Sequence, residues 1–290
     1  MRSRNGLLCA SAAIDMFAST TWKACAFQSI EKQDQTIFSL LGGRVDHLGT
    51  TRCRVWDPPR GKCGCSAPVS LTGRNHTVVE MGANDGTHMS NSYFFSKTLG
   101  WRALLIEGNP EVYKRIAMNR PEAERVNTLV GNPLDFPPDG KATFFSFYRP
   151  GDSEKRDSSR DWETGLSGIA APNSSSNADL RSAAHARRYA ARYGVAFRQH
   201  RLDVVRFSAL LSDMFIDKID VLFLDVEGAE LSVLQTLNFK QHPVRVLVVE
   251  RPTQEVSQLL KAHGYDDLRF TFDSGGDRVF FASRREAKWT

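Results

Sequence analysis

The chain has 290 residues, of which 41% are apolar and 24% are charged, a balance typical of a soluble globular protein with one sizeable core. No apolar run approaches the length of about 20 residues that a membrane-spanning helix requires. The net charge of +5 allows an acidic partner without demanding one, and a solvated basic surface is the simpler explanation.

The chain divides near residue 68. Residues 1–67 show little periodicity, and we expect an N-terminal extension there that wraps on the main domain or is partly disordered. Its first residues are rich in Arg, Ser and Ala, which is compatible with a targeting peptide for an organelle or for secretion and leaves the compartment open. It also holds all five cysteines, Cys9, Cys25, Cys53, Cys63 and Cys65. No second cysteine pair or clustered histidine follows them at ligand spacing, so we expect no metal site.

Residues 68–290 form the expected main domain. From Thr77 onward, short apolar runs alternate with helical stretches, which predicts βαβ units and a parallel sheet. Pro110 opens a helix at its first turn, where the missing N–H costs nothing, and another helix is expected at 90–99. The strands that we expect in this half lie at residues 77–80, 103–107, 126–130 and 142–147.

The second half begins with a polar segment, residues 151–176, that predicts a long loop. Asn177 then caps an expected helix over 178–193, which Gly194 ends. This helix is basic and could attract an anionic substrate, although a solvated face is the simpler interpretation. The remaining pattern predicts helices at 207–214, 230–237 and 255–263, strands at 220–225 and 244–250, and a hairpin formed by 268–272 and 278–282.

Four of the expected strands end in a carboxylic acid, and these acids are Glu80, Glu107, Asp225 and Glu250. The carboxyl ends of parallel strands meet at one edge of the sheet, where open α/β sheets bind ligands. Acids gathered there repel one another and lose hydration, unless a cation or a hydroxyl-rich ligand lies among them. A preference of acids for turns explains one such strand more readily than four.

The sharpest local motif is EMGANDG, residues 80–86, between a strand and a helix, as a nucleotide-binding glycine turn requires. Gly82 permits the tight turn, and Glu107 ends the next strand, where a carboxylate can accept both ribose hydroxyls. A dinucleotide fingerprint needs bare backbone N–H groups, but Asn84 and the anionic Asp85 stand at those positions. The motif therefore favours S-adenosylmethionine, a cation without phosphate.

A second motif, DVEGAE at residues 225–230, carries a strand end into a helix through a sharp turn. We expect Asp225 and Glu227 to project over the sheet edge near the transferred methyl group, whereas Glu230 has a simpler role at the helix dipole. The hypothesis is direct displacement of the methyl group from sulfur to oxygen. A neutral alcohol is a poor nucleophile, so Asp225 or Glu227 would accept its proton or bind a divalent ion. His88 and His185 are weaker candidates for the base.

Together these segments resemble the FkbM family of methyltransferases over roughly residues 77–282. The matching segments are VVEMGANDG (78–86), LLIEGNP (104–110), LD (202–203) and IDVLFLDVEGAE (219–230). The resemblance implies a Rossmann-like class I methyltransferase fold of the α/β class, with a seven-stranded, mostly parallel sheet whose last strand runs antiparallel. It also implies S-adenosylmethionine as the cofactor and O-methylation, often of a sugar or another small-molecule hydroxyl.

The resemblance also assigns roles by position. It places the methionine part of the cofactor against Glu80, Gly82, Asn84 and Gly86, the ribose on Glu107 and the adenine near Asn132. The charge of Asp85 adds to the preference for a cationic cofactor. The long polar segment 151–176 and the cysteine-bearing N-terminal region depart from the family pattern. They leave the acceptor open, because such variable loops commonly build acceptor pockets.

Two other functions stay open at this stage. A non-catalytic descendant of the fold, serving as a binding or trafficking module, would not need the Gly82 turn and Glu107, which argue against it. A nucleic-acid methyltransferase would explain the basic helix, but aromatics interleaved with the basic residues and an Asn/Asp-Pro-Pro-Tyr/Phe base pocket are both missing. We therefore expect a small-molecule or glycan acceptor, no nucleic-acid partner and no transmembrane segment. The sequence does not determine the oligomeric state.

Overall fold

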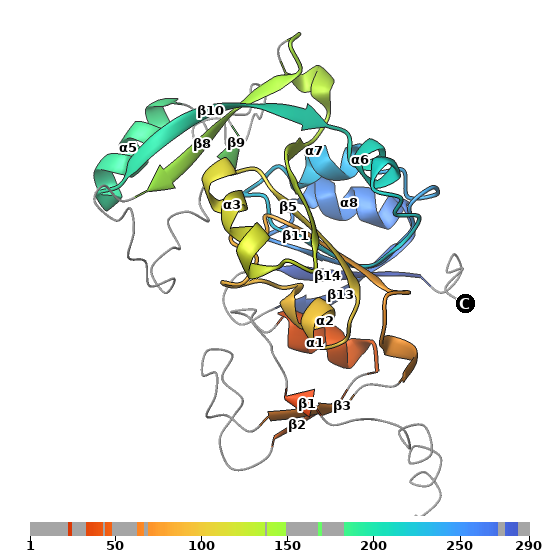
Figure 1. Cartoon of the computed structure of the whole chain (residues 1–290). Coiled ribbons are helices and arrows are strands. Elements are labelled where there is room, and N and C mark those ends of the chain that lie inside the picture. The colour runs from red at the N-terminus through yellow and green to blue at the C-terminus, as the bar shows by residue number, and fades with distance from the viewer. Residues whose placement is uncertain are drawn as a thin grey trace, which may run out of the picture.

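The computed structural model describes residues 23–24, 33–42, 44–47, 63–66, 69–136, 138–148, 168–169, 183–271 and 276–283. Its centre is a seven-stranded sheet with the strand order β13-β14-β12-β11-β4-β5-β6 (Figure 1). The strands from β12 to β6 pair in parallel, whereas β14 runs antiparallel to both of its neighbours. The expected sheet with an antiparallel last strand is therefore confirmed. The strand bounds are β4 Thr77–Met81, β5 Arg102–Glu107, β6 Glu124–Asn127, β11 Ile219–Leu224, β12 Val244–Val249, β13 Tyr265–Thr271 and β14 Arg278–Ala282.

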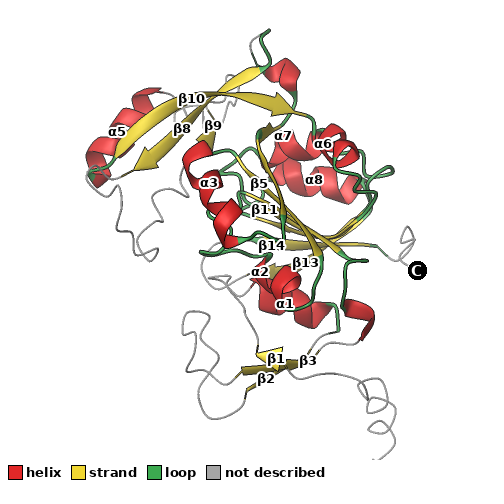
Figure 2. Cartoon of the chain, in the orientation of Figure 1, coloured by secondary structure: helices red, strands yellow, loops and turns green. Residues whose placement is uncertain are grey.

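Helices cover both faces of this sheet (Figure 2). One apolar layer joins the sheet to α1, α2 and α3, and the other joins it to α6, α7 and α8. Because both faces are covered, β4, β11 and β12 are nearly continuous apolar runs rather than alternating ones. The helix bounds are α1 Gln33–Leu40, α2 Tyr93–Lys97, α3 Pro110–Asn119, α6 Phe207–Asp213, α7 Glu230–Gln235 and α8 Gln254–Ala262. None of the described helices is long and apolar enough to cross a membrane.

Part of the N-terminal region packs into this core. Phe38 of α1 is fully buried, and its ring meets that of Phe94 edge-on at 4.8 Å between centroids. Gln33, at the start of α1, donates a hydrogen bond to Asp277 beside β14. Short strands in the same region, β1 Lys23–Ala24, β2 Arg44–His47 and β3 Cys63–Ser66, form a separate sheet.

A second sheet extends from the main one. Its strand order is β7-β10-β8-β9, with β7 Leu129–Val130, β8 Lys141–Tyr148, β9 Gly168–Ile169 and β10 Ala196–Val205. β8 and β10 pair antiparallel along the whole of β8, and α5 (Ala183–Tyr193) packs on one face of the pair. We call β8, β9, α5 and β10 the arm, because they reach away from the main sheet above α3 in Figure 1.

The structure differs from the sequence-based expectations at three places. The single strand expected at 126–130 is divided into β6 and β7, which belong to different sheets and are separated by Thr128. The helix expected at 90–99 is confined to α2, because residues 90–92 instead form a loop bonded to Glu80. β10 was not expected at all, since exposed polar residues hide its alternation. Most of the loop 151–176, as well as the cap Asn177, lies outside the described residues.

Candidate active site

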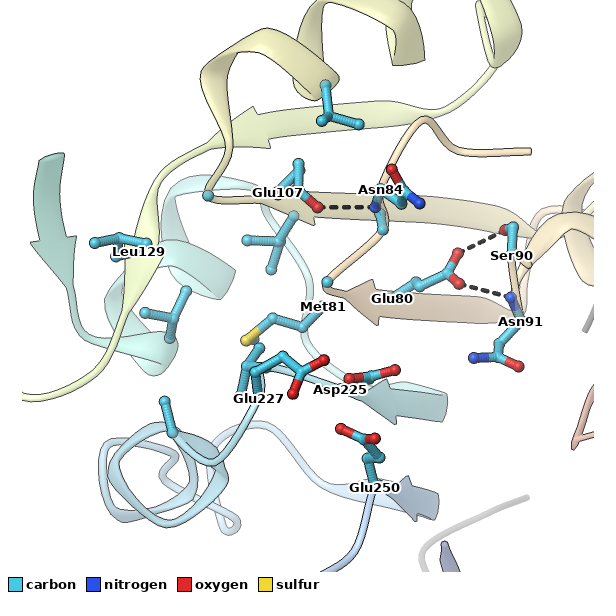
Figure 3. Close-up of a pocket in the computed structure, with 18 of the residues that line it drawn as sticks. Glu80, Met81, Asn84, Ser90, Asn91, Glu107, Leu129, Asp225, Glu227 and Glu250 are labelled. Atoms are coloured by element: carbon cyan, nitrogen blue, oxygen red, sulfur yellow. Dashed lines mark hydrogen bonds between the residues drawn. The ribbon is translucent and has the colours of Figure 1, made fainter. Parts of the chain in front are cut away.

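A cavity of about 310 Å³ opens at the carboxyl edge of the main sheet (Figure 3). The chain leaves β4 toward β5 and β6 on one side and returns to β11 and β12 on the other, so the cavity lies at the topological switch point of the sheet. The four neighbouring strands β12, β11, β4 and β5 each bring their terminal acid to it. The expected convergence of Glu250, Asp225, Glu80 and Glu107 is therefore confirmed.

The floor of the cavity depends on a contact between the two motif loops. Gly82 has a φ of +84°, and a Cβ atom there would overlap the carbonyl oxygen of Asp225. The backbone N–H of Asp225 in turn donates to the carbonyl of Met81 at 3.1 Å. The turn after β4 is also bonded to β5, because the N–H groups of Gly82 and Ala83 donate to the carbonyl of Ile106. Only glycine fits at position 82, and its small size brings the loops after β4 and β11 together.

Glu107 lies in this cavity with both carboxylate oxygens engaged by the backbone. One oxygen accepts the N–H of Asn84 at 2.8 Å, and the other accepts the N–H of Asn109 at 2.7 Å. Burial raises the pKa of Glu107 to about 7, although these N–H groups oppose the shift. A carboxylate offers about four lone-pair positions, so each oxygen can accept one more hydrogen bond. Glu107 is fixed in orientation and still able to accept two hydroxyls.

Glu80 is also buried in the cavity lining, but its hydrogen bonds go to the protein itself. Its carboxylate accepts the hydroxyls of Ser90 and Ser92 at 2.7 and 2.6 Å and the N–H of Asn91 at 2.6 Å. Burial raises the pKa of Glu80, and these donors together with the Arg120 charge oppose the shift. In Figure 3 the carboxylate points toward the loop that carries Ser90 and Asn91. Glu80 therefore shapes the site by fixing the loop at residues 90–92.

Behind that loop lies a fully buried arginine that the sequence analysis did not single out. The guanidinium of Arg120 donates to the carbonyl of Gly86 at 2.7 Å, to the hydroxyl of Ser96 at 2.5 Å and to Glu122 at 2.8 Å. A Cβ atom on Gly86 would lie 2.9 Å from the Arg120 side chain. Arg120 thus ties the glycine turn to α2, and Gly86 leaves room for it.

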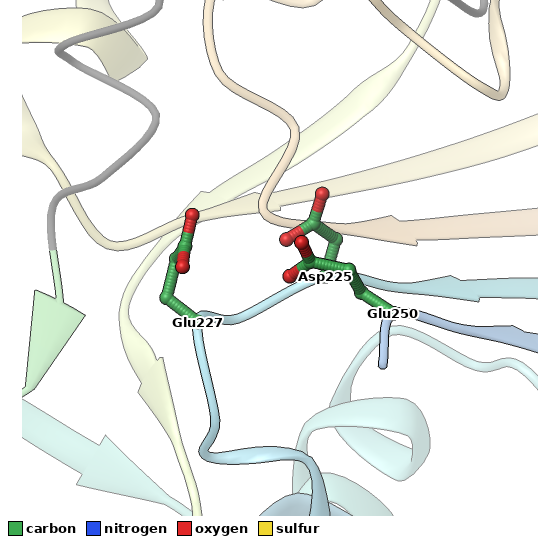
Figure 4. Close-up of side chains that lie close together, drawn as sticks. All are labelled: Asp225, Glu227 and Glu250. Atoms are coloured by element: carbon green, nitrogen blue, oxygen red, sulfur yellow. The ribbon is translucent and has the colours of Figure 1, made fainter. Parts of the chain in front are cut away.

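Three acids meet at the opposite wall of the cavity (Figure 4). Asp225, Glu227 and Glu250 each place a carboxylate oxygen within 4.8 Å of the others. Burial raises the pKa of Asp225 well above its usual value, and a hydrogen bond with Glu250 and the charges of Glu250 and Glu227 add to the shift. The side chain of Asp225 lines the cavity and is exposed to solvent there. Arg251 pairs with Glu250 at 3.1 Å.

Comparison with known proteins identifies the family. Residues 80–266 match the methyltransferase FkbM domain family, which is more than half of the chain. The chain belongs to this family. Its membership supports S-adenosylmethionine as the cofactor of this methyltransferase, as the sequence predicts.

No curated protein matches the chain, but several solved structures do. A precorrin-6y C5,15-methyltransferase from Geobacter metallireducens is 12% identical, with 74% of this chain and 85% of that chain covered and a TM-score of 0.36. A fibrillarin from Aeropyrum pernix, solved with natively bound S-adenosyl-L-methionine, is 11% identical, with coverages of 83% and 82% and a TM-score of 0.37. A methyltransferase from Pyrococcus furiosus is 14% identical, with coverages of 73% and 77% and a TM-score of 0.32. Similarity at this level identifies no substrate.

The structure places the expected site residues of this FkbM methyltransferase in two groups. Those that line the cavity are Glu80, Gly82, Asn84, Glu107, Asp225 and Glu227. Asp85 and Gly86 are not part of the lining. Asp85 accepts the N–H groups of Thr87 and His88, and so fixes the turn from behind.

Asn132 also lies outside the lining. It caps a short 3-10 helix, Pro133–Asp135, by accepting the N–H of Leu134, and it accepts a hydrogen bond from Arg206. Residues just before it line the cavity instead, together with β8; these are Thr128, Leu129, Val130 and Phe144. The apolar run 129–130 is visible in the sequence, but it could be placed at the cavity only once the break between β6 and β7 was known.

The cluster of Asp225, Glu227 and Glu250 could also hold a divalent cation. Partly exposed acids often gather without one, and no histidine or cysteine of the described residues joins this group. We therefore assign no metal to the site.

Proposed function

We propose that this methyltransferase transfers the methyl group of S-adenosylmethionine to a hydroxyl oxygen of a small-molecule or glycan acceptor. The observation that carries the proposal is the charge of the cavity. Among the described residues, its lining holds five acids, Glu80, Glu107, Asp225, Glu227 and Glu250, against one arginine, Arg251, and one histidine, His88. This balance suits a ligand that carries an ammonium and a sulfonium and disfavours a pyrophosphate.

The cofactor would lie across the ends of β5, β4 and β11. Glu107 would accept the two ribose hydroxyls through the lone pairs that its backbone donors leave open. The apolar side chains at Ile106, Leu129 and Val130 offer a surface for the adenine ring. The turn at Gly82, which a Cβ atom would fill, leaves space for the methionine part.

When bound, S-adenosylmethionine supplies a methyl group activated by a positively charged sulfur. The protein has to hold the acceptor oxygen in line with the bond between this methyl group and the sulfur, and it has to remove the proton of the acceptor hydroxyl. We assign the proton acceptor role to Glu227, because the carboxyl of Asp225 is already engaged in a hydrogen bond with Glu250. Asp225 would then orient the acceptor or the cofactor through hydrogen bonds, with its position fixed by Gly82 and Glu250.

Calorimetry with S-adenosylmethionine and S-adenosylhomocysteine tests the cofactor assignment. We expect Glu107→Ala to weaken binding of both ligands about 10- to 100-fold, because hydrogen bonds to a charged acceptor contribute about 1.5–3 kcal/mol. Glu111→Ala is the matched control, since Glu111 is an exposed acid on α3 that pairs with Lys114. Absence of binding by the wild type, or equal binding by the Glu107 variant, would overturn the assignment.

Turnover is tested by following S-adenosylhomocysteine formation with a panel of sugars and other hydroxyl compounds. We expect Glu227→Gln to lower turnover at least 100-fold with little change in cofactor affinity. Asp225→Asn is expected to lower it less, because it keeps a neutral hydrogen-bonding group in place. Full activity in both variants would remove these residues from the chemistry. Cofactor binding without turnover of any hydroxyl acceptor would favour a binding or trafficking module instead.

A further inference from the structure

One face of the arm continues directly from the wall of the cavity. Cross-strand partners in an antiparallel pair share a face. Phe144 of β8, whose side chain lines the cavity, is paired with His200 of β10. The next pair outward on the same face is Ser146 with Arg198, followed by Tyr148 with Ala196. This face therefore leads from the cavity toward the outer end of the arm.

The opposite face of the arm is occupied. Phe145 and Phe147 of β8 and Phe197 of β10 pack there against α5, where Phe147 and Tyr189 bring their ring centroids to 4.7 Å. The basic residues of α5 are therefore carried by a helix on the far side of the arm from the cavity. They do not explain how an acceptor would be selected at the site.

Arg198 on the cavity side differs from the neighbouring cations of the arm. Lys141 pairs with Asp203, and Arg201 pairs with Asp139, each at 2.6 Å. Among the described residues, no carboxylate lies within ion-pair distance of Arg198. Its guanidinium instead lies 4.4 Å from the centre of the Tyr148 ring. An exposed guanidinium held on an aromatic ring keeps its donors available for an oxyanion.

The adjoining polar group is also placed for a hydroxylated ligand. His200 and Ser146 share a hydrogen bond of 2.8 Å between Nε2 and Oγ. Burial lowers the pKa of His200, which keeps the imidazole neutral near pH 7. Successive residues on one face of a strand are about 7 Å apart, so Arg198 is roughly the length of one sugar ring outward from the pair that contains the cavity-lining Phe144.

We propose that Arg198 and Tyr148 form an acceptor subsite that binds an oxyanion carried by the hydroxyl-bearing acceptor, such as the carboxylate of a uronic acid or the phosphate of a sugar phosphate. Negative and positive side chains lie in different parts of the site, as this proposal requires. Acids would surround the cationic cofactor in the cavity, and the Arg198 guanidinium, which has no carboxylate partner among the described residues, lies about one ring length beyond the cavity-lining Phe144. The subsite rests on the proposed function, because it takes the acceptor to be a hydroxyl compound that enters from the arm side.

Direct titration tests the subsite without requiring turnover. D-glucose, D-glucuronate and D-glucose 6-phosphate are titrated into the full-length protein, with and without saturating S-adenosylhomocysteine. We expect at least one anionic sugar to bind 10-fold or more tightly than glucose, and whichever of the two binds more tightly identifies the oxyanion. Arg198→Gln should abolish this advantage. Arg188→Gln, which removes an exposed arginine from α5, should preserve it.

Two results would overturn the subsite. One is equal binding of the neutral sugar and both anionic sugars by the wild type. The other is an equal loss in both arginine variants, which would show a diffuse effect of positive charge rather than a localised contact. Failure to bind S-adenosylhomocysteine would count against the proposed function, whereas the sugar titrations without it would still decide the subsite. Thermal melting of both variants checks that the fold is unchanged.

Discussion

Gly82 and Asp225 lie in such close contact that a Cβ atom on Gly82 would overlap the carbonyl oxygen of Asp225. The two residues are far apart in the sequence, but β4 and β11 are neighbours in the sheet, and their loops meet at its carboxyl edge. The loop after β4 belongs to the proposed cofactor site, and the loop after β11 carries the acids proposed for methyl transfer. Their contact therefore sets the distance between cofactor and catalytic groups.

Gly82→Ala should damage both folding and binding. The substituted residue would keep a positive φ and would also have to displace the backbone at Asp225, so we expect a loss of about 3 kcal/mol or more in the free energy of unfolding. The matched control is Gly73→Ala, where φ is +95° and nothing lies within 4 Å of the added Cβ. That variant should lose only about 1–2 kcal/mol. Urea unfolding gives both values, and equal losses would show that the contact with Asp225 does not matter.

The sequence was sufficient to predict the strands of the main sheet, because these strands are buried on both faces and appear in the sequence as short apolar runs. Acids at the ends of four such runs predicted the convergence at Glu80, Glu107, Asp225 and Glu250. The arm could not be predicted in the same way. β10 alternates weakly, with exposed Arg198, Gln199 and Arg201, and it is recognised as a strand only through its pairing with β8.

The roles of the site residues could likewise be predicted only in part from the sequence. Whether a motif residue reaches the ligand or supports the loop from behind depends on side-chain direction, which residue type and spacing do not give. Glu80 and Asp85 illustrate this, because both accept hydrogen bonds from the protein's own loops. Arg120 shows the converse case. It lies at the end of a surface-like helix sequence, and only the fold buries it beneath the glycine turn.

Glu107→Gln should change stability in a pH-dependent way. The folded protein holds the Glu107 proton more tightly than the unfolded chain does, since the pKa rises from 4.5 to about 7. Wild-type stability should therefore fall as the pH rises through this interval, by about 3 kcal/mol in total. Glutamine has no such proton to lose. As the pH rises through this interval, the unfolding free energy of the variant should therefore increase relative to that of the wild type by about 3 kcal/mol.

Urea unfolding between about pH 4 and pH 8 measures this difference, with Glu111→Gln as an exposed control that should show almost no trend. The same substitution should weaken cofactor binding, because the amide nitrogen replaces one of the two oxygens that would accept ribose hydroxyls. A stability difference that does not vary with pH would contradict the assigned burial of the Glu107 charge.

Arg120→Met should destabilise the protein, although Arg120 itself is not a residue of the cavity lining. Its guanidinium is 0% exposed, and removing it leaves the carbonyl of Gly86 and the hydroxyl of Ser96 without this donor. We expect a loss of about 3 kcal/mol in unfolding free energy. Arg125→Met, on the exposed side of β6, should change it by no more than about 0.5 kcal/mol. If the two variants unfold alike, the buried arginine is not needed to hold the turn.

Cofactor binding should release a proton from Asp225. Burial, a hydrogen bond with Glu250 and the charges of Glu250 and Glu227 raise its pKa, so Asp225 keeps its proton to a higher pH than an ordinary carboxyl does. A cation in the cavity favours the carboxylate, and binding must then expel that proton. The affinity for S-adenosylmethionine should therefore increase with pH until Asp225 is ionised in the free protein, and level off above that point.

Calorimetry in two buffers with different ionisation enthalpies measures the number of protons released. Asp225→Asn removes the Asp225 contribution, and we expect its binding enthalpy to depend less on the buffer than that of the wild type. A remainder should persist, because Glu107 has a pKa of about 7 and is also expected to lose its proton when it accepts the ribose. The double variant Asp225→Asn/Glu107→Gln should reduce the remainder further. Equal proton release by the wild type and Asp225→Asn would place the bound cation elsewhere than beside Asp225, since a cation at that position cannot leave the carboxyl protonated.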